Sequence, residues 1–285
     1  MSVKRKKIYI KKKINKKIIK QVKYASAFIC EGIFQIKYSK GCFIFTTSLK
    51  VNKNLLKQGL NKIIQRFQEA KNFKSEIIFE HKKNINSHGL VEIKKLVKEG
   101  KIFYETNGLI NWRSPIAKII DFLDFCILRK FSPFFDLHHE HYPNVIKLDD
   151  LAKTNHLNSF PEHIHFVSSL KPVLKKIDQY SLIAKKNKSF TPSSQLLESP
   201  HLVHNPSTCY HCYLSHEKKS ISNNKSVTSI TTCHRYESSN HNELGRLVEF
   251  KLREIIFIGS PKFILNSRKK TIKIAKKFFN DWNLS

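Results

Sequence analysis

The chain has 285 residues, of which 40% are hydrophobic and 11% aromatic, a composition that allows a buried core and excludes global disorder. This length suits one large domain, or a domain accompanied by a smaller one. The formal net charge of +30 normally indicates a nucleic acid or an anionic membrane as partner. We discount that indication because lysine carries most of the charge, whereas surfaces that read phosphate more often use the bidentate fork of arginine.

Cysteine usage and hydropathy predict the compartment. The N-terminus is basic but lacks the apolar segment of a secretory signal, and no run of about 18 apolar residues is present to form a membrane-spanning helix. A disulfide framework is therefore not expected, and we predict a cytoplasmic protein without a membrane partner. The cysteines are Cys30, Cys42, Cys126, Cys209, Cys212 and Cys233.

Residues 1–108 are predicted to form a small basic α+β N-terminal domain without a recognisable group of catalytic or metal-binding residues. Met1–Lys23 fits either a basic arm or a strand with a helix, and Ala27–Ser48 alternates as two strands with Gly41 at their turn. Asn54–Lys71 has a helical apolar stripe. The other predicted features are a short strand at Ile77–Glu80, surface histidines at His81 and His88, and a boundary turn at Asn107–Gly108.

A helical pattern begins at Ser114, where Ser114–Pro115 predicts a capped start with proline at the first helical position. The stretch that follows ends in the histidine-rich sequence HHEHYPNVI. His139 and His141 would share one face of a strand, which is a feasible geometry for two metal ligands. The alternative is a strand that ends near Pro143 and binds no metal.

Three further segments complete the predicted elements. Leu148–His156 reads as a short helix with Asp149 and Asp150 in its first turn. Lys185–Ser199 is polar and predicts a loop. Pro261–Trp282 has the pattern of an amphipathic helix.

Cys209 and Cys212 form a Cys-x-x-Cys motif in a stretch that we expect to be extended. Thiolates at this spacing suit zinc, but a structural site needs a second pair of ligands, and the chain offers only Cys233 and scattered histidines. On a strand Cys212 would face away from Cys209, and His211 would share the face of Cys209. Buried cysteines without metal are the alternative.

The stretch from Thr231 to Gly259 predicts strand, polar loop and strand. Arg235 and Glu237 are two residues apart, so on a strand they would point to the same face. The guanidinium could then bind a phosphate and the carboxylate a donor such as the adenine amino group of the same ligand. The alternative is a hairpin with a charged, solvated face.

The pattern RYE, polar loop, Arg246 and then EF and RE resembles motif 2 of the class II aminoacyl-tRNA synthetases. It is most similar to the archaeal-type seryl-tRNA synthetases and to the amino acid:[carrier protein] ligases. The resemblance implies ATP binding, with Arg235 on the α-phosphate, Glu237 on the adenine and Arg246 as a further nucleotide contact. Pro143 resembles the proline that ends the strand of motif 1, which implies a homodimer through that region.

The implied fold class is α+β, with an antiparallel class II synthetase-like sheet flanked by helices and the small α+β domain at the N-terminus. Residues 109–285 would form an incomplete catalytic domain. A stretch that begins FPEH also resembles the loop before the active-site strands of the carrier-protein ligases.

By the same resemblance, Cys209 and Glu254 match two ligands of an active-site zinc. The third ligand, a cysteine, and the Gly-x-Gly-x-x-Arg strand of motif 3 would lie beyond Ser285. We therefore expect a chain truncated relative to that family, with an incomplete Zn2+ site.

The resemblance implies ATP- and Mg2+-dependent activation of a small amino acid and its transfer to the phosphopantetheine thiol of an acyl or peptidyl carrier protein. We prefer the carrier to tRNA because the N-terminal region shows no long coiled-coil pattern. The alternatives are a seryl-tRNA synthetase-like protein that acts on tRNA, or a non-catalytic remnant or half of a split enzyme.

Overall fold

A computed structural model describes residues 3–9, 14, 18–69, 78–79, 89–106, 108–186, 191–238, 240 and 245–281. The strand predicted at Ile77–Glu80 falls largely outside these residues, and His81, His88 and Trp282 lie outside them. The chain forms two compact units: Met1–Glu80, Tyr104–Leu109 and Glu237–Val248 make the first, and the remainder makes the second. The predicted domain boundary at residue 108 stays a prediction.

The first unit is built on a three-stranded antiparallel sheet with the order β1-β3-β2. Its strands are β1 (Val3–Tyr9), β2 (Ile33–Ser39) and β3 (Cys42–Ser48), and its helices are α1 (Ile19–Ser26) and α2 (Lys53–Glu69). Gly41 has φ of 75° at the tight turn between β2 and β3, as predicted.

The core of the first unit follows from two periodicities. Alternate residues of β3, Phe43 and Phe45, point to one face and are fully buried. Leu56, Leu60 and Ile64 recur every four residues along α2 and pack into the same core. The predicted strands and helix are confirmed here.

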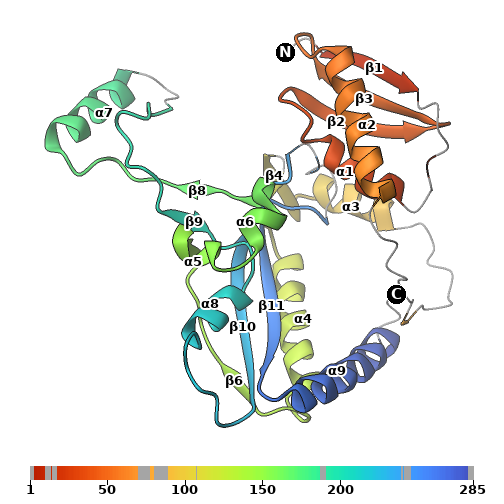
Figure 1. Ribbon diagram of the computed structural model, residues 1–285, viewed down its shortest axis with the longest axis vertical. Helices are drawn as coiled ribbons and strands as arrows, with labels where there is room; N and C mark the ends of the chain where they lie inside the picture. Colours follow the sequence, from red (N-terminus) through yellow and green to blue (C-terminus); the bar gives the residue numbers. More distant parts are fainter. Residues whose placement is uncertain are drawn as a thin grey trace. The chain divides into compact units, whose positions relative to one another are not determined.

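The second unit contains the predicted hairpin. Strands β10 (Lys225–His234) and β11 (Glu249–Ile258) pair antiparallel over their whole length, and β6 (Leu137–His139) runs parallel to β10. Figure 1 shows β10 and β11 side by side. The strands are shorter than predicted: β10 ends at His234, so Arg235 and Glu237 do not lie on a strand and the shared-face argument for them was wrong.

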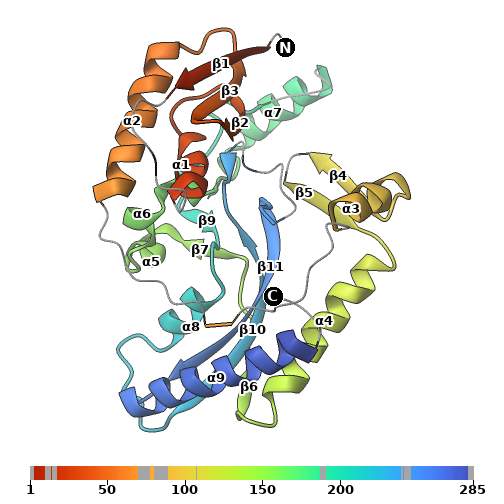
Figure 2. The same cartoon turned by 90° about the vertical axis from the view of Figure 1, so that its right-hand side faces the viewer.

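Helices α4 (Ile116–Phe131) and α9 (Pro261–Asp281) pack against one face of this sheet. Figure 2 shows both helices beside β6, β10 and β11. The guanidinium of Arg253 on β11 makes two bonds of 2.7 Å to the carboxylate of Asp124 on α4. The predicted capping by Ser114 was wrong, because Pro115 is the N-cap of α4 and no side chain caps it.

A second three-stranded sheet, order β7-β9-β8, is surrounded by short helices. Its elements are β7 (Val145–Lys147), β8 (Phe166–Val167), β9 (Leu202–His204), α5 (Leu148–Ala152), α6 (His156–Ser159), the 3-10 helix η2 (Pro161–His163) and α8 (Cys209–Ser215). The remaining described elements are α3 (Gly89–Lys98), the paired strands β4 (Ile102–Thr106) and β5 (Leu109–Trp112), and α7 (Leu174–Lys186). Within the described part of the chain, no helix combines the length and apolarity needed to cross a bilayer.

Candidate functional site

Arg235 follows the last residue of β10 and is held by two contacts within the second unit. Its Nε donates to the carbonyl oxygen of Pro206 at 3.0 Å, and its guanidinium lies over the ring of Phe250, 5.3 Å from the centroid. The side chain is half-buried. Because these contacts use one N–H and one flat face, the planar fork keeps further N–H donors for an anion.

A buried histidine and a tyrosine lie close to Arg235. His156 is 6% exposed, and its Nδ1 lies 2.8 Å from the hydroxyl of Tyr210. Burial, and to a smaller extent the neighbouring His163 and Arg235, lower the pKa of His156 to about 4. The imidazole is therefore neutral near pH 7. Sequence reasoning missed both residues, although His156 stands just before the FPEH segment that it had singled out.

One face of the β10–β11 hairpin continues from Arg235 toward Glu254. The register pairs Cys233 with Phe250, Thr231 with Leu252 and Ser229 with Glu254. The paired residues of an antiparallel ladder point to the same face. Among the described residues, the buried hydroxyls of Ser229 and Thr231 have no hydrogen-bond partner.

Cys209 and Glu254, the two predicted zinc ligands, lie at the far end of this face. The hydroxyl of Ser207 donates to Oε1 of Glu254 at 3.0 Å and lies 3.4 Å from Sγ of Cys209. The carboxylate raises the pKa of the Cys209 thiol, but burial raises it more. The structure thus brings together two residues that are 45 positions apart in the sequence.

The extended conformation expected around the Cys-x-x-Cys motif was wrong, since Cys209 begins helix α8. Residues three apart lie on one side of a helix, so Cys212 does not face away from Cys209. Cys212 is fully buried and packs with Val227 and Ile256 of the hairpin, with Cys209 against the same cluster. A helix places both thiols toward the sheet, whereas a strand would place only one there.

Zinc would take the thiolate of Cys209 and the carboxylate of Glu254, but catalytic zinc normally has three protein ligands. In the part of the chain that the structure describes, no group of three His, Cys, Asp or Glu side chains is arranged to hold a metal ion. Burial also raises the pKa of Cys209, Cys212 and Cys233, which favours the protonated thiols. These donors do not make a complete zinc site, and we derive no chemical step from zinc.

The alternative metal pair in the histidine-rich stretch does not have the assumed geometry. Strand β6 ends at His139, so His139 and His141 do not share a strand. Glu140 between them accepts a hydrogen bond of 2.5 Å from the hydroxyl of Tyr142.

Glu237 and Arg246 belong to the first unit and form an ion pair there. Nη1 of Arg246 lies 3.1 Å from Oε2 of Glu237, whose residue is 6% exposed. The guanidinium of Arg246 also lies over the ring of Tyr24 on α1, 4.3 Å from the centroid. The sequence predicted both residues as nucleotide contacts but did not predict that they pair with each other.

Three imidazoles near Arg235 were also missed by sequence reasoning. The rings of His204 and His234 are 4.0 Å apart, and those of His165 and His204 are 6.4 Å apart. Nε2 of His234 lies 2.9 Å from Oε2 of Glu249. Burial is the main cause that lowers the pKa of His165 and His234, and their neighbouring imidazoles lower it further. Only β9 folding against the end of β10 brings these residues together, so no spacing in the sequence signals them.

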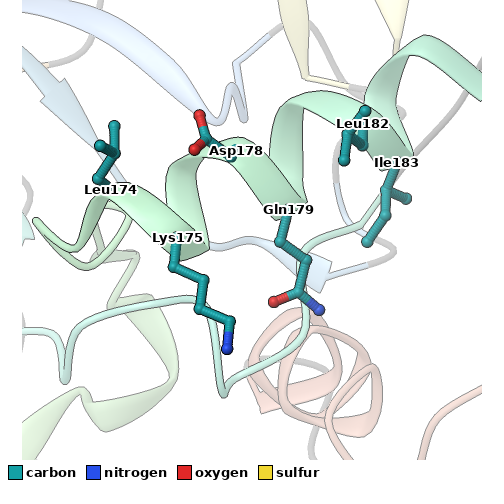
Figure 3. A pocket seen from close by; sticks show the side chains of 6 residues that line it. All are labelled: Leu174, Lys175, Asp178, Gln179, Leu182 and Ile183. Carbon is teal, nitrogen blue, oxygen red and sulfur yellow. The ribbon is translucent and has the colours of Figure 1, made fainter.

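The surface hollows lie apart from this face. A groove of about 610 Å³ follows α7 and is lined by that helix alone, with Lys175 and Gln179 pointing to one side and Asp178 to another (Figure 3). A second hollow of about 540 Å³ lies at the opposite end of β11, beside Gly259 and Ser260. Neither hollow is lined by Arg235, Glu237, Arg246, Cys209 or Glu254.

The arrangement is the fold of the class II aminoacyl-tRNA synthetases. The M. kandleri SerRS, crystallised in complex with A. aeolicus tRNASec, superposes with a TM-score of 0.67 at 13% sequence identity, over 96% of this chain and 55% of that one. The prolyl-tRNA synthetase of Giardia lamblia, in complex with prolyl-adenylate, has a TM-score of 0.51 at 14% identity, over 66% of this chain and 35% of that one. The predicted fold class is confirmed.

Curated relatives narrow the likeness to two kinds of ligase. The type-2 serine–tRNA ligase of Methanocaldococcus jannaschii is 27% identical over 190 residues, which cover 65% of this chain and 35% of the relative. Amino acid–[acyl-carrier-protein] ligase 2 of Bradyrhizobium diazoefficiens is 28% identical over 146 residues, or 50% of this chain and 42% of the relative. No family model matches the chain. The resemblance predicted from motif 2 is confirmed, and the chain spans about a third of the length of the serine–tRNA ligases it matches.

Proposed function

We propose that the chain takes part in ATP-dependent activation of a small amino acid and its transfer to the phosphopantetheine thiol of a carrier protein. The observation that supports this most is the convergence of two predicted groups on one face. Arg235 follows β10 directly, and Glu254, which shares the Ser207 hydroxyl with Cys209, is paired with Ser229 on the same hairpin. Burial raises the pKa of Tyr210 and Cys233 most, and each of them is also close enough for Arg235 to lower its pKa and for Cys209 and Glu254 to raise it. A cation for a phosphate and the two side chains that the resemblance links to the amino acid thus share one surface.

In the proposed reaction the carboxylate oxygen of the amino acid attacks the α-phosphorus of ATP. A P–O bond forms, the bond to the β-phosphate oxygen breaks, and pyrophosphate leaves. Arg235 stabilises the added negative charge on the α-phosphate oxygens, while Glu237 and Arg246 bind the base. The sulfur of the carrier thiol then attacks the acyl carbon and loses its proton to solvent, the bond from the acyl carbon to the phosphate oxygen breaks, and AMP leaves. Mg2+, when bound with ATP, would supply further charge neutralisation.

The test is ATP–pyrophosphate exchange with glycine, alanine and serine, together with ATP binding measured by calorimetry. Arg235→Ala should weaken ATP binding by at least tenfold, since a charge-assisted bond contributes about 1.5–3 kcal/mol. The matched control is Arg268→Ala, which removes an exposed arginine of α9. ATP binding that is equal in wild type and Arg235→Ala would refute the motif 2 assignment. Binding without exchange would favour the remnant or split-enzyme alternative.

A tRNA acceptor is the second candidate, favoured by the first unit. The register places Lys7, Ile44 and Lys37 in one row across the sheet, and Arg5 lies on the same face of β1. These cations are exposed, and the three strands contain no acidic residue. Such a face can contact a phosphate backbone.

The salt response of tRNA binding separates the two acceptors. A tRNA binder should lose about 0.7–0.9 log units of affinity per log unit of salt for each phosphate contact. A carrier-protein ligase should form no tight tRNA complex near physiological salt. Sub-micromolar binding there, lost in Arg5→Ala combined with Lys7→Ala, would decide for tRNA.

We also propose a homodimer through the motif 1 region. Ile119, Phe122 and Phe125 recur at helical spacing on α4 and are 47, 55 and 52% exposed. An exposed apolar stripe of this kind is typical of a protein interface. Light scattering should show a dimer for the wild type and a monomer for Ile119→Glu.

A further inference from the structure

The loop between the two motif 2 strands is attached to the N-terminal part of the chain. Its described residues from Glu237 to Val248 fall in the same compact unit as α1 and the β1-β3-β2 sheet. The backbone N–H of Val248, at the end of the loop, donates to the carbonyl of Gly108 at 2.8 Å. The loop is thus held by residues more than a hundred positions away in the sequence.

The loop contacts the C-terminal end of α1. The hydroxyl of Ser238 donates to the carbonyl of Ala27 at 3.2 Å, and Nδ2 of Asn240 donates to the carbonyl of Tyr24 at 3.3 Å. These bonds hold Ser238 and Asn240 against the end of the helix that carries Tyr24.

Tyr24 contacts Arg246, the side chain that forms an ion pair with Glu237. The guanidinium of Arg246 lies over the Tyr24 ring, and its Nη1 donates to Oε2 of Glu237. A cation over an aromatic face contributes more when it is desolvated, and here the side chain of Arg246 is 34% exposed and that of its partner Glu237 is 8% exposed. A carboxylate has two oxygens, so pairing at Oε2 orients Oε1 rather than consuming it.

We propose that Tyr24 is a positioning residue for the adenine of ATP. By holding Arg246, Tyr24 orients the Glu237 carboxylate, which accepts a hydrogen bond from the adenine amino group. This rests on the proposed function, because it assumes that ATP is the ligand. It assigns the N-terminal unit a direct part in nucleotide affinity, independent of which acceptor that unit serves.

The experiment compares Tyr24→Leu, Tyr24→Phe and the control Tyr104→Leu, which removes an exposed tyrosine of the first unit. Calorimetry with ATP and with inorganic tripolyphosphate separates base binding from phosphate binding. Tyr24→Leu should weaken ATP about tenfold, the size of a partly buried cation–π contact, and leave tripolyphosphate unchanged. Tyr24→Phe and Tyr104→Leu should stay within about twofold of wild type, because the first keeps the ring.

A double-mutant cycle tests whether the effect passes through Arg246. If it does, the losses of ATP affinity in Arg246→Ala and Tyr24→Leu should be strongly non-additive. Once Arg246 is gone, removing the Tyr24 ring takes away a contact that no longer exists. Hydrogen exchange of the peptides from Glu237 to Val248, measured without nucleotide, should quicken in Tyr24→Leu and not in Tyr24→Phe.

Each contrary outcome has one meaning. A wild type that does not bind ATP refutes the proposed function, and the inference falls with it. ATP binding equal in wild type and Tyr24→Leu refutes the inference alone, as does an equal loss for ATP and tripolyphosphate or an additive cycle.

Discussion

The two ends of the β10–β11 hairpin face differ in how many of the side chains needed for their proposed ligands are in place. At one end Arg235 is anchored by Pro206 and Phe250 and keeps donors for an anion. At the other end Cys209 and Glu254 share Ser207, and burial holds the thiol protonated. A cation needs only to be positioned, whereas a metal site needs a full set of ligands at once. The end proposed to bind phosphate is therefore formed within this chain, and the end proposed to bind metal offers two of the three ligands that catalytic zinc normally has.

The largest expected effect is a loss of folding stability at low pH, caused by His156 beside Arg235. The pKa of His156 is lowered to about 4 in the folded protein, against an ordinary value near 6.5. Below pH 6.5 His156 binds a proton in the unfolded chain but not in the folded chain. The free energy of unfolding therefore falls as the pH is lowered to about 4, by roughly 3 kcal/mol.

The measurement is the free energy of unfolding from denaturant titrations between pH 7 and pH 4. His156→Gln should lose most of this acid sensitivity, and the exposed control His141→Gln should keep it. An identical pH profile for wild type and His156→Gln would show that His156 is not the group responsible.

Arg235→Lys sharpens the comparison by keeping the charge and removing the planar fork. The bond from Nε to the Pro206 carbonyl and the contact with Phe250 both depend on the guanidinium. We expect ATP affinity to fall about tenfold, because lysine binds phosphate as a point charge without the same orientation. Wild-type affinity in Arg235→Lys would mean that charge alone matters at this end.

Ser207→Ala tests whether the Cys209 and Glu254 end is held as a unit. Loss of the hydroxyl bridge should lower the free energy of unfolding by about 1 kcal/mol. The bond from Ser207 lowers the pKa of Cys209, so its loss should raise that pKa and slow alkylation of Cys209, followed by mass spectrometry. The exposed Ser222→Ala is the control and should change neither quantity.

Metal removal should have the smallest effect. With two ligands of the three that catalytic zinc normally uses, these 285 residues purified under reducing conditions should contain little or no zinc. A chelator should leave the melting temperature unchanged. One zinc per chain by elemental analysis, lost in Cys209→Ser and in Glu254→Ala, would show that the metal end is complete. Zinc lost in Cys212→Ser but retained in Glu254→Ala would indicate a structural Cys-x-x-Cys site instead.

The sequence by itself determined the elements with strong periodicity. Hydrophobic periodicity predicts the conformation of each of these elements. They are the β-branched and aromatic run at the end of β11, the apolar stripe of α2 and the long amphipathic pattern of α9. The family resemblance also singled out Arg235, Cys209 and Glu254 as candidate site residues; their roles stay a prediction, and the structure shows that Cys209 and Glu254 lie on either side of Ser207. Local patterns succeed here because each residue of these elements buries or exposes its side chain at a regular interval.

Only the tertiary structure decided the features that depend on distant partners. Seven residues of α8 are too few for a period, so packing of Cys212 on Val227 and Ile256 selects the helix over the strand. Where β10 ends, and therefore where Arg235 points, is set by Pro206 and Phe250. The partners of Arg246 are set by Tyr24, 222 positions earlier in the sequence. Spacing along a chain carries no record of such contacts, because their free energy arises only when separate elements have already packed together.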